Sequence, residues 1–276
     1  MRRALLVLAL AAGASWPREA EASPYRLALG VDSKIWTAVL LSGAAATAVG
    51  GGDALTASEV ATLSRREVNW LDRSATSRYS TSAATASHLL VGACVAAPVA
   101  IASAPVLRAD WRVLGVMYLE TFFLANWVPD IGKGMVDRKR PYLYNDDAPL
   151  EDKLDDGGGR RSFPSGHTTM AFATAAFGAT ALADYHPGSQ RAARLGKGLM
   201  LIAATVGGLR YAAGAHYPTD VVAGALLGGA IGHLVPRLHR VGDSAEARSG
   251  DEATRRLSLA PAPVWGGVGL SCGWAL

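Results

Sequence analysis

Hydrophobic residues gather in six segments that are separated by polar connections. The segments run over Ile35–Gly52, Ala86–Leu107, Val113–Val128, Thr168–Leu182, Gly198–Leu209 and Val221–Val235. Apolar stretches with small residues at helical spacing, joined by short polar links, are typical of helix bundles. The pattern therefore predicts an all-α bundle of about six apolar helices. Residues 53–79 between the first two segments are expected to be partly helical and amphipathic, which suits a membrane surface.

Composition favours a membrane-embedded bundle, because 50% of the residues are hydrophobic and only 18% are charged. The segment lengths leave a soluble bundle open as the alternative. Only Ala86–Leu107 has the length of a full span, and two prolines, at 98 and 105, interrupt it. Gly198–Leu209 has about twelve residues, a length more typical of a core helix. Glu120 inside the third segment requires that helix to turn a polar side inward or toward protein.

The N-terminus has the pattern of a secretory signal peptide. A basic start, Met1-Arg2-Arg3, precedes an apolar run and an Ala-x-Ala site that ends at Ala22. We expect residues 1–22 to be this signal, with an uncleaved anchor as the alternative. Residues 23–84 then hold the first apolar helix and the amphipathic connection, 85–240 the core bundle, and 241–276 a polar linker and a Gly/Pro-rich tail. A small hairpin is predicted in the tail around Gly266 and Gly267.

Charge and cysteine content exclude several classes of function. The net charge is +4, and little of it remains for a nucleic-acid surface once the cations of the motifs below are set aside. Cys94 and Cys272 form no disulfide framework and are expected to be unpaired. Four histidines outside those motifs have no ligand spacing with acids or cysteines, so no metal is expected at His88, His186, His233 or His239.

Lys133, Arg140 and Pro141 form the first of three candidate motifs. Lys133 and Arg140 are seven residues apart, which on an α-helix is two turns and nearly the same face. Two such cations can hold one multiply charged anion, and Pro141 would end the helix. Taken alone, the run is equally a solvated basic face, since Arg138 and Lys139 belong to it.

Pro164-Ser165-Gly166-His167 is the second motif, and an apolar helical run follows it directly. Ser165 is a natural N-cap, and the amides of the first turn form an anion site. Gly166 allows the backbone to approach a ligand closely, and His167 would stand on the first turn. The alternative is a capped helix with an incidental histidine.

Arg210, His216 and Asp220 form the third motif, at the end of one apolar segment and the start of another. His216 and Asp220 are four residues apart, so the carboxylate can accept the imidazole N–H and leave the other nitrogen as a nucleophile. A His–Asp capping contact is the alternative for this pair alone. If the last four segments alternate in direction, all three motifs meet at one end of the bundle and form one phosphate site.

The three motifs together resemble the signature of the type 2 phosphatidic acid phosphatase superfamily, which also holds vanadium haloperoxidases and bacterial acid phosphatases. That signature is K-x6-R-P, then P-S-G-H, then S-R-x5-H-x3-D. Here 22 residues separate Pro141 from Pro164 and 42 separate His167 from Arg210, and the resemblance covers roughly residues 85–236. Leu209 stands where the family has serine, which removes a possible hydrogen bond to phosphate or to the arginine.

The resemblance implies a metal-independent, cofactor-free phosphatase. His216 would be the nucleophile that forms a phosphohistidine, Asp220 would orient it, and His167 would be the general acid and then the base. The phosphate would be held by Lys133, Arg140, Ser165, Gly166 and Arg210.

Implied substrates are lipid phosphates or diphosphates, among them phosphatidic acid, phosphatidylglycerol phosphate, undecaprenyl diphosphate and lipid A phosphates. Two alternatives stay open: a soluble periplasmic acid phosphatase of broad specificity and a vanadate-dependent haloperoxidase. The expected location is the bacterial cell envelope, in the inner membrane with the site facing the periplasm, or else the periplasm itself. Six spans after a cleaved signal would put the site on the cytoplasmic side, so an outward site requires one segment that does not span. The sequence leaves the oligomeric state open.

Overall fold

The computed structural model describes residues 23–50, 53–102, 108–154, 158–241, 257–264 and 267–274. The α-helices within them are α2 (Leu29–Ala48), α3 (Ala57–Ala61), α4 (Thr81–Ala102), α5 (Trp111–Met135), α6 (Leu150–Lys153), α7 (Gly166–Tyr185), α8 (Gln190–Ala212) and α9 (Pro218–Leu238). Short 3₁₀ turns are η1 (Arg65–Glu67), η2 (Arg73–Ser77), η3 (Arg108–Asp110), η4 (Pro141–Tyr144) and η5 (Gly158–Arg160). The predicted all-α fold and its six apolar helices are confirmed. The expected signal segment, residues 1–22, lies outside the described residues.

The tail contains the hairpin that its Gly pair predicted. Strands β1 (Leu257–Val264) and β2 (Gly267–Trp274) pair antiparallel, with Leu257 opposite Trp274 and Val264 opposite Gly267.

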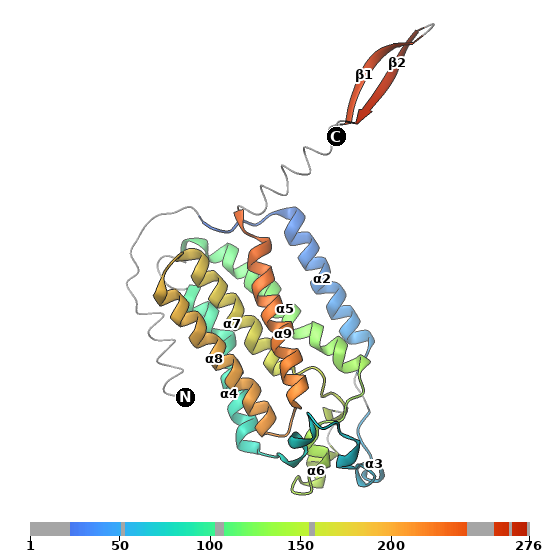
Figure 1. The fold of residues 1–276 in the computed structure, drawn as a ribbon, viewed down its shortest axis with the longest axis vertical. Helices are drawn as coiled ribbons and strands as arrows, with labels where there is room; N and C mark the ends of the chain where they lie inside the picture. The colour runs from blue at the N-terminus through green and yellow to red at the C-terminus, as the bar shows by residue number, and fades with distance from the viewer. Residues whose placement is uncertain are drawn as a thin grey trace.

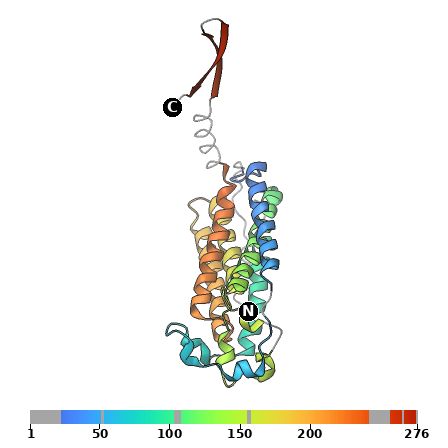
Figure 2. The same cartoon turned by 90° about the vertical axis from the view of Figure 1, so that its right-hand side faces the viewer.

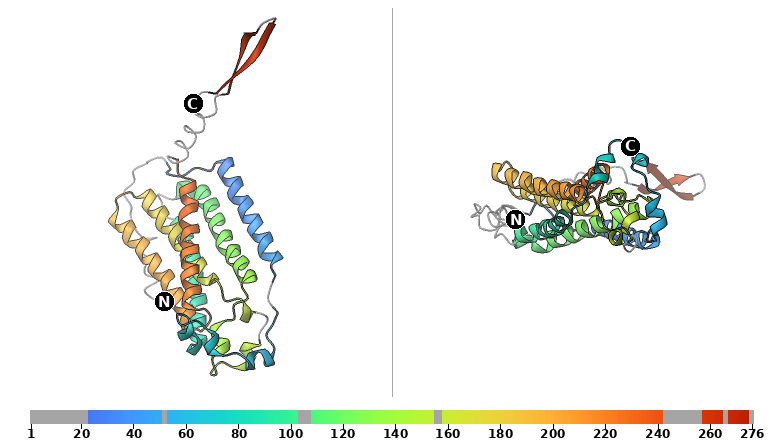
Figure 3. Two further views of the ribbon diagram at one scale, coloured as in Figure 1. Left: turned by 45° about the vertical axis from the view of Figure 1, so that its right-hand side comes forward. Right: turned by 90° about the horizontal axis from the view of Figure 1, so that it is seen from below.

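Helix α7 is the central element of the bundle. It packs against α4, α5, α8 and α9, while α2 packs along α5 (Figure 1). Seen from below, α8 and α9 lie in one layer and α4 and α5 in the other (Figure 3). Alanine and threonine fill most buried positions of α7, and small side chains of this kind let its neighbours approach closely.

A stripe of glycines on α9 makes the closest helix contact. A Cβ atom added at Gly224 would lie 2.6 Å from the Ser165 carbonyl oxygen, and one at Gly228 only 2.1 Å from that of Thr169. Gly232 would meet the Ala173 carbonyl at 2.0 Å. Backbone therefore packs on backbone here, which is possible only where the side chain is a hydrogen atom. The stripe sets how near the start of α9 lies to the start of α7.

Within the residues that the structure describes, three helices are long and apolar enough to cross a membrane: Thr81–Ala100, Gln190–Ala212 and Pro218–Leu238. The expected short helix at Gly198–Leu209 was therefore wrong, because α8 begins eight residues earlier. Its first two turns carry Arg191, Arg194 and Lys197, and these charges hid the helix from a hydrophobicity pattern. Pro98 lies inside α4 without ending it.

The outer faces of these three helices carry large apolar side chains. Leu89 on α4, Leu201 on α8 and Leu226 on α9 are all exposed in the isolated chain. Exposed apolar faces of this kind, spread over long helices, are typical of contact with lipid or with partner helices.

The last four long helices alternate in direction, as the motif positions required. The end of α5, the start of α7, the end of α8 and the start of α9 share one end of the bundle (Figure 1). The short helices α3 and α6 gather at that same end (Figure 2). Residues 53–79 are partly helical, as expected, and they contact this end through the packing of η2 on η4.

Gly228→Ala is expected to destabilise the protein by about 3 kcal/mol, because the new methyl group would force α9 away from the Thr169 carbonyl. Thermal unfolding in detergent, followed by circular dichroism, measures the change. Gly229→Ala is the matched control: nothing lies within 4 Å of a Cβ at that position. A Tm for the Gly228 variant equal to that of the control would contradict the proposed close packing.

Candidate active site

The first motif does not lie on one helix, which corrects the sequence interpretation. Lys133 is in the last turn of α5, but the helix ends at Met135, and Arg140 precedes η4. The chain between them pairs with the loop before α7: the Arg140 N–H donates to the Gly159 carbonyl at 2.7 Å. Arg140 thus reaches the second motif through loop pairing and not through helical periodicity.

Ser165 occupies the N-cap position of α7, as predicted, but its hydroxyl does not cap the helix. The hydroxyl hydrogen-bonds to that of Thr168 at 2.8 Å, and the Ser165 N–H donates to the Asp220 carbonyl oxygen at 3.1 Å. A Cβ at Gly166 would lie 2.9 Å from the Lys133 Nζ. The missing side chain at Gly166 therefore lets the Lys133 ammonium lie against the start of α7, where the first-turn amides are free of helical partners.

His216 lies in the turn between α8 and α9, after Gly214, whose φ is +69°. The imidazole is 2% exposed, and its Nδ1 is 2.7 Å from the Ser162 carbonyl oxygen but 3.7 Å from Asp220 Oδ2. The predicted hydrogen bond from the imidazole to the carboxylate was therefore wrong, because the longer distance exceeds hydrogen-bond range. Nδ1–H donates to Ser162 instead, which leaves Nε2 as the nitrogen with a free lone pair.

The Asp220 carboxylate instead binds the residues around His216. It accepts from the Ser162 hydroxyl at 2.5 Å and from the Tyr217 N–H at 2.9 Å, and it pairs with Arg138. Arg138 also pairs with Asp72, at 2.6 Å. Asp220 therefore orients His216 indirectly, by fixing the segment that carries the Ser162 carbonyl.

Arg138, Asp72 and Ser162 are residues that the sequence interpretation missed. Arg138 was assigned to a solvated basic face, yet it joins two fully buried carboxylates. Asp72 also accepts from both the N–H and the hydroxyl of Thr219. No local spacing reveals such contacts, because Asp72 is separated from Arg138 by 66 residues and from Thr219 by 147.

Arg210 is a buried cation with unused hydrogen-bonding capacity. It is 4% exposed, its Nη1 donates to the Ser87 hydroxyl at 3.1 Å, and its Nε is buried without a hydrogen-bond partner. Within the described chain, no carboxylate lies within 4.0 Å of its guanidinium. Ser87 on α4 supplies the arginine with a hydroxyl contact, although Leu209 replaces the serine of the family pattern. A buried arginine in this state favours an anionic ligand.

The electrostatic environment keeps His216 neutral. Burial lowers the pKa of His216 well below its ordinary value, and the positive charges of Arg140, Arg210 and Lys133 lower it further. The first and third motifs therefore act on one imidazole. A neutral imidazole with Nε2 unprotonated is the form that can act as a nucleophile.

His167 stands on the first turn of α7 with a second imidazole beside it. Its Nε2 is 2.9 Å from Nδ1 of His88, and Arg210 and His216 also interact with it electrostatically. The sequence interpretation placed His88 in a core or interface, whereas α4 brings it to this end of the bundle. Lys133, Arg140, His167, Arg210 and His216 are thus gathered around the start of α7.

Residues 114–242 match the sequence model of the PAP2 superfamily. The matched segment holds all three motifs, and the predicted resemblance to this superfamily is confirmed.

Among solved structures, the crystal structure of the first transmembrane PAP2-type phosphatidylglycerolphosphate phosphatase from Bacillus subtilis is similar to this chain at 21% identity. The alignment covers 93% of this chain and 99% of that one, with a TM-score of 0.38. No curated protein matches the sequence.

Arg138→Gln is expected to lower the free energy of unfolding by about 2 kcal/mol, because Asp72 and Asp220 would stay buried without their shared cation. Thermal unfolding of the purified variant measures the loss. Lys139→Gln, the neighbouring cation, is the matched control and should leave Tm near that of the native chain. Equal Tm values for the two variants would show that the Arg138 bridge contributes nothing to stability.

Proposed function

We propose that this protein is a metal-independent phosphatase that hydrolyses a lipid phosphate or lipid diphosphate through a phosphohistidine intermediate. The observation that carries the proposal is the convergence of three cations, Lys133, Arg140 and Arg210, on a buried neutral imidazole at His216. Cations, an available nitrogen nucleophile and a second histidine are sufficient to bind a phosphoryl group, attack it and protonate its leaving group.

In the first step, the lone pair on Nε2 of His216 attacks phosphorus. The P–N bond forms as the P–O bond to the alcohol breaks, and the departing oxygen takes a proton from His167, which enters the step as the imidazolium that the bound phosphate anion stabilises. Transition-state charge on the phosphoryl oxygens is stabilised by the three cations and by the amide of Gly166 at the start of α7. The Nδ1–H bond to Ser162 supports this role, since it holds the reactive nitrogen in one tautomer.

In the second step, water attacks the phosphohistidine and gives its proton to His167. The P–N bond breaks, and its electron pair returns to Nε2 of His216. His88 lies 2.9 Å from Nε2 of His167 and offers a neighbouring group with which that proton can be exchanged. Asp220 acts as a positioning residue through Ser162, and no step in this sequence needs a metal ion or a cofactor.

The lipid nature of the substrate is proposed from the surface of the bundle. Three helices of the described part of the chain are long and apolar enough to cross a membrane, and their outer faces carry exposed leucines. The site lies at one end of these helices, so helices that crossed a bilayer would hold it near the depth of the lipid headgroups. We propose the inner membrane as the location, with this end facing the periplasm.

Phosphate release by the purified full chain, with a chelator present, tests the proposal. Detergent-dispersed phosphatidic acid, phosphatidylglycerol phosphate and undecaprenyl diphosphate are compared with p-nitrophenyl phosphate. We expect turnover of at least one lipid to exceed that of the soluble ester. His216→Ala should lower kcat by at least about 1,000-fold, whereas His186→Ala, at the far end of α7, should leave it unchanged.

Near-normal turnover by the His216 variant would contradict the nucleophile assignment. Equal turnover of lipids and small esters would favour a phosphatase of broad specificity. Activity lost with chelator and restored by magnesium would contradict the metal-independent reaction.

His167→Asn should separate proton donation from phosphate binding. A phosphate ester with an alcohol leaving group needs a proton at the departing oxygen, whereas p-nitrophenolate leaves readily without one. We therefore expect kcat to fall about 100-fold or more for the lipid and far less for p-nitrophenyl phosphate. An equal loss on both substrates would contradict the general-acid role.

A further inference from the structure

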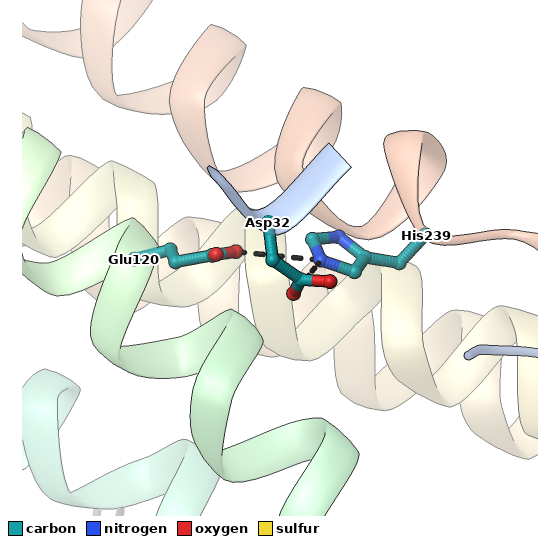
Figure 4. Close-up of side chains that lie close together, drawn as sticks. All are labelled: Asp32, Glu120 and His239. Atoms are coloured by element: carbon teal, nitrogen blue, oxygen red, sulfur yellow. Dashed lines mark hydrogen bonds and ion pairs between the residues drawn. The ribbon is translucent and has the colours of Figure 1, made fainter. Parts of the chain in front are cut away.

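Three side chains that could hold a metal ion meet at the opposite end of the bundle from the phosphate motifs. Asp32 comes from the first turn of α2, Glu120 from α5, and His239 follows the last residue of α9. Nε2 of His239 is 3.2 Å from Asp32 Oδ1 and 3.5 Å from Glu120 Oε2 (Figure 4). Figure 4 shows both carboxylates pointing toward the same ring nitrogen.

The burial of Glu120 is not compensated by any hydrogen bond to its carboxylate within the described chain. Glu120 is 0% exposed, and both of its carboxylate oxygens are buried without a hydrogen-bond partner. Within the described residues, the imidazole of His239 is the only cationic partner within 4.0 Å of either Glu120 or Asp32. Asp32 is partly exposed and accepts the Ala28 N–H at 2.5 Å, whereas burying the Glu120 carboxylate without adequate compensation costs several kcal/mol.

The orientation of His239 increases this conflict. Its Nδ1 is 2.8 Å from the Val235 carbonyl oxygen, so Nδ1–H donates to the backbone. In the neutral ring, Nε2 then carries a lone pair, and this lone pair faces two carboxylates. These three atoms carry lone pairs that repel one another, and a cation placed between them would bind all three as ligands. A backbone carbonyl that accepts the other ring N–H is also the usual support of a metal-binding histidine.

We propose that Asp32, Glu120 and His239 bind a divalent transition-metal ion, with Zn²⁺ as the ion to test. Ligands placed tetrahedrally at the usual Zn–N and Zn–O bond lengths lie roughly 3.3 Å from one another. The two measured separations, 3.2 and 3.5 Å, agree with that spacing. Two carboxylates and a neutral imidazole also balance a charge of +2, which suits a buried site. Asp32 is partly exposed and leaves room for a water molecule as the fourth ligand.

The role of this site is structural. Lys133 lies 13 residues after Glu120 on α5, which corresponds to roughly 20 Å along the helix, so the ion is remote from the proposed phosphate chemistry. Its three ligands belong to the beginning of α2, the first half of α5 and the end of α9. The ion therefore ties α2 to the core of the bundle, and the ion's binding does not depend on the proposed phosphatase reaction.

Zinc binding by the purified full chain tests the inference. Protein in detergent is stripped with EDTA, dialysed against buffered ZnCl₂ and analysed for bound metal by mass spectrometry and for Tm. We expect one Zn²⁺ per chain at this site and a higher Tm with zinc than without it. His239→Gln and Glu120→Gln should each weaken zinc binding more than about 100-fold and abolish the zinc-dependent rise in Tm.

Two controls separate this site from other histidines. His233→Gln, on α9 but outside the cluster, should bind zinc as the native chain does. His167→Asn tests for adventitious binding at the phosphate end and should also retain the ion. Absence of bound zinc in the native chain would overturn the proposal. Undiminished binding in both the His239 and Glu120 variants, or loss of binding in His167→Asn alone, would overturn it as well. Since bound metal and Tm are measured without substrate, failure here would not bear on the phosphatase assignment.

Discussion

The candidate active site depends on the hydrogen bonds and the ion pair of the buried Asp220 carboxylate. Asp220 lies at the start of α9, yet its partners come from the loop before α7 and from the chain after α5, through Ser162 and Arg138. Arg138 extends the network to Asp72, which precedes η2. A buried carboxylate is costly unless it is compensated, so these contacts hold the four segments together. That arrangement sets the Ser162 carbonyl against Nδ1 of His216 and thereby leaves Nε2 with the free lone pair.

The packing of α9 on α7 makes this network possible. The glycines at 224, 228 and 232 let the two backbones touch, so that the Asp220 carbonyl can accept from Ser165 across the helix starts. Two motifs that are 42 residues apart in the chain are thereby brought together. The same small-residue packing leaves large side chains such as Leu226 for the outer surface. The sequence of α9 therefore determines both properties: its glycines face α7 and allow close packing, and its large apolar side chains face outward.

Each end of the bundle buries an uncompensated charged group: a cation at one end and a carboxylate at the other. At one end, Arg210 is buried without a carboxylate in the described chain, and an anionic substrate would resolve that conflict. At the other end, Glu120 is buried without a hydrogen bond, and a divalent cation would resolve it. Buried charge of one sign is costly in either case, and each cost is removed by a ligand of the opposite sign. The proposed chemistry and the proposed structural ion thus follow from one physical rule applied at two places.

The sequence by itself determined the six apolar helices, the resemblance to the PAP2 superfamily and the convergence of the three motifs. Hydrophobic periodicity and motif order are local properties, and alternating helices leave only one way to bring the motif ends together. It did not determine the start of α8, because charges at the helix ends interrupt the apolar pattern. Only the tertiary structure placed Arg140 on a loop, gave the His216 N–H to Ser162 and brought Arg138 to Asp72 and Asp220. It also brought His239, which has no ligand spacing in the chain, to Asp32 and Glu120. Such contacts join residues that are tens to hundreds of positions apart. They depend on how the helices pack, and no local spacing encodes that.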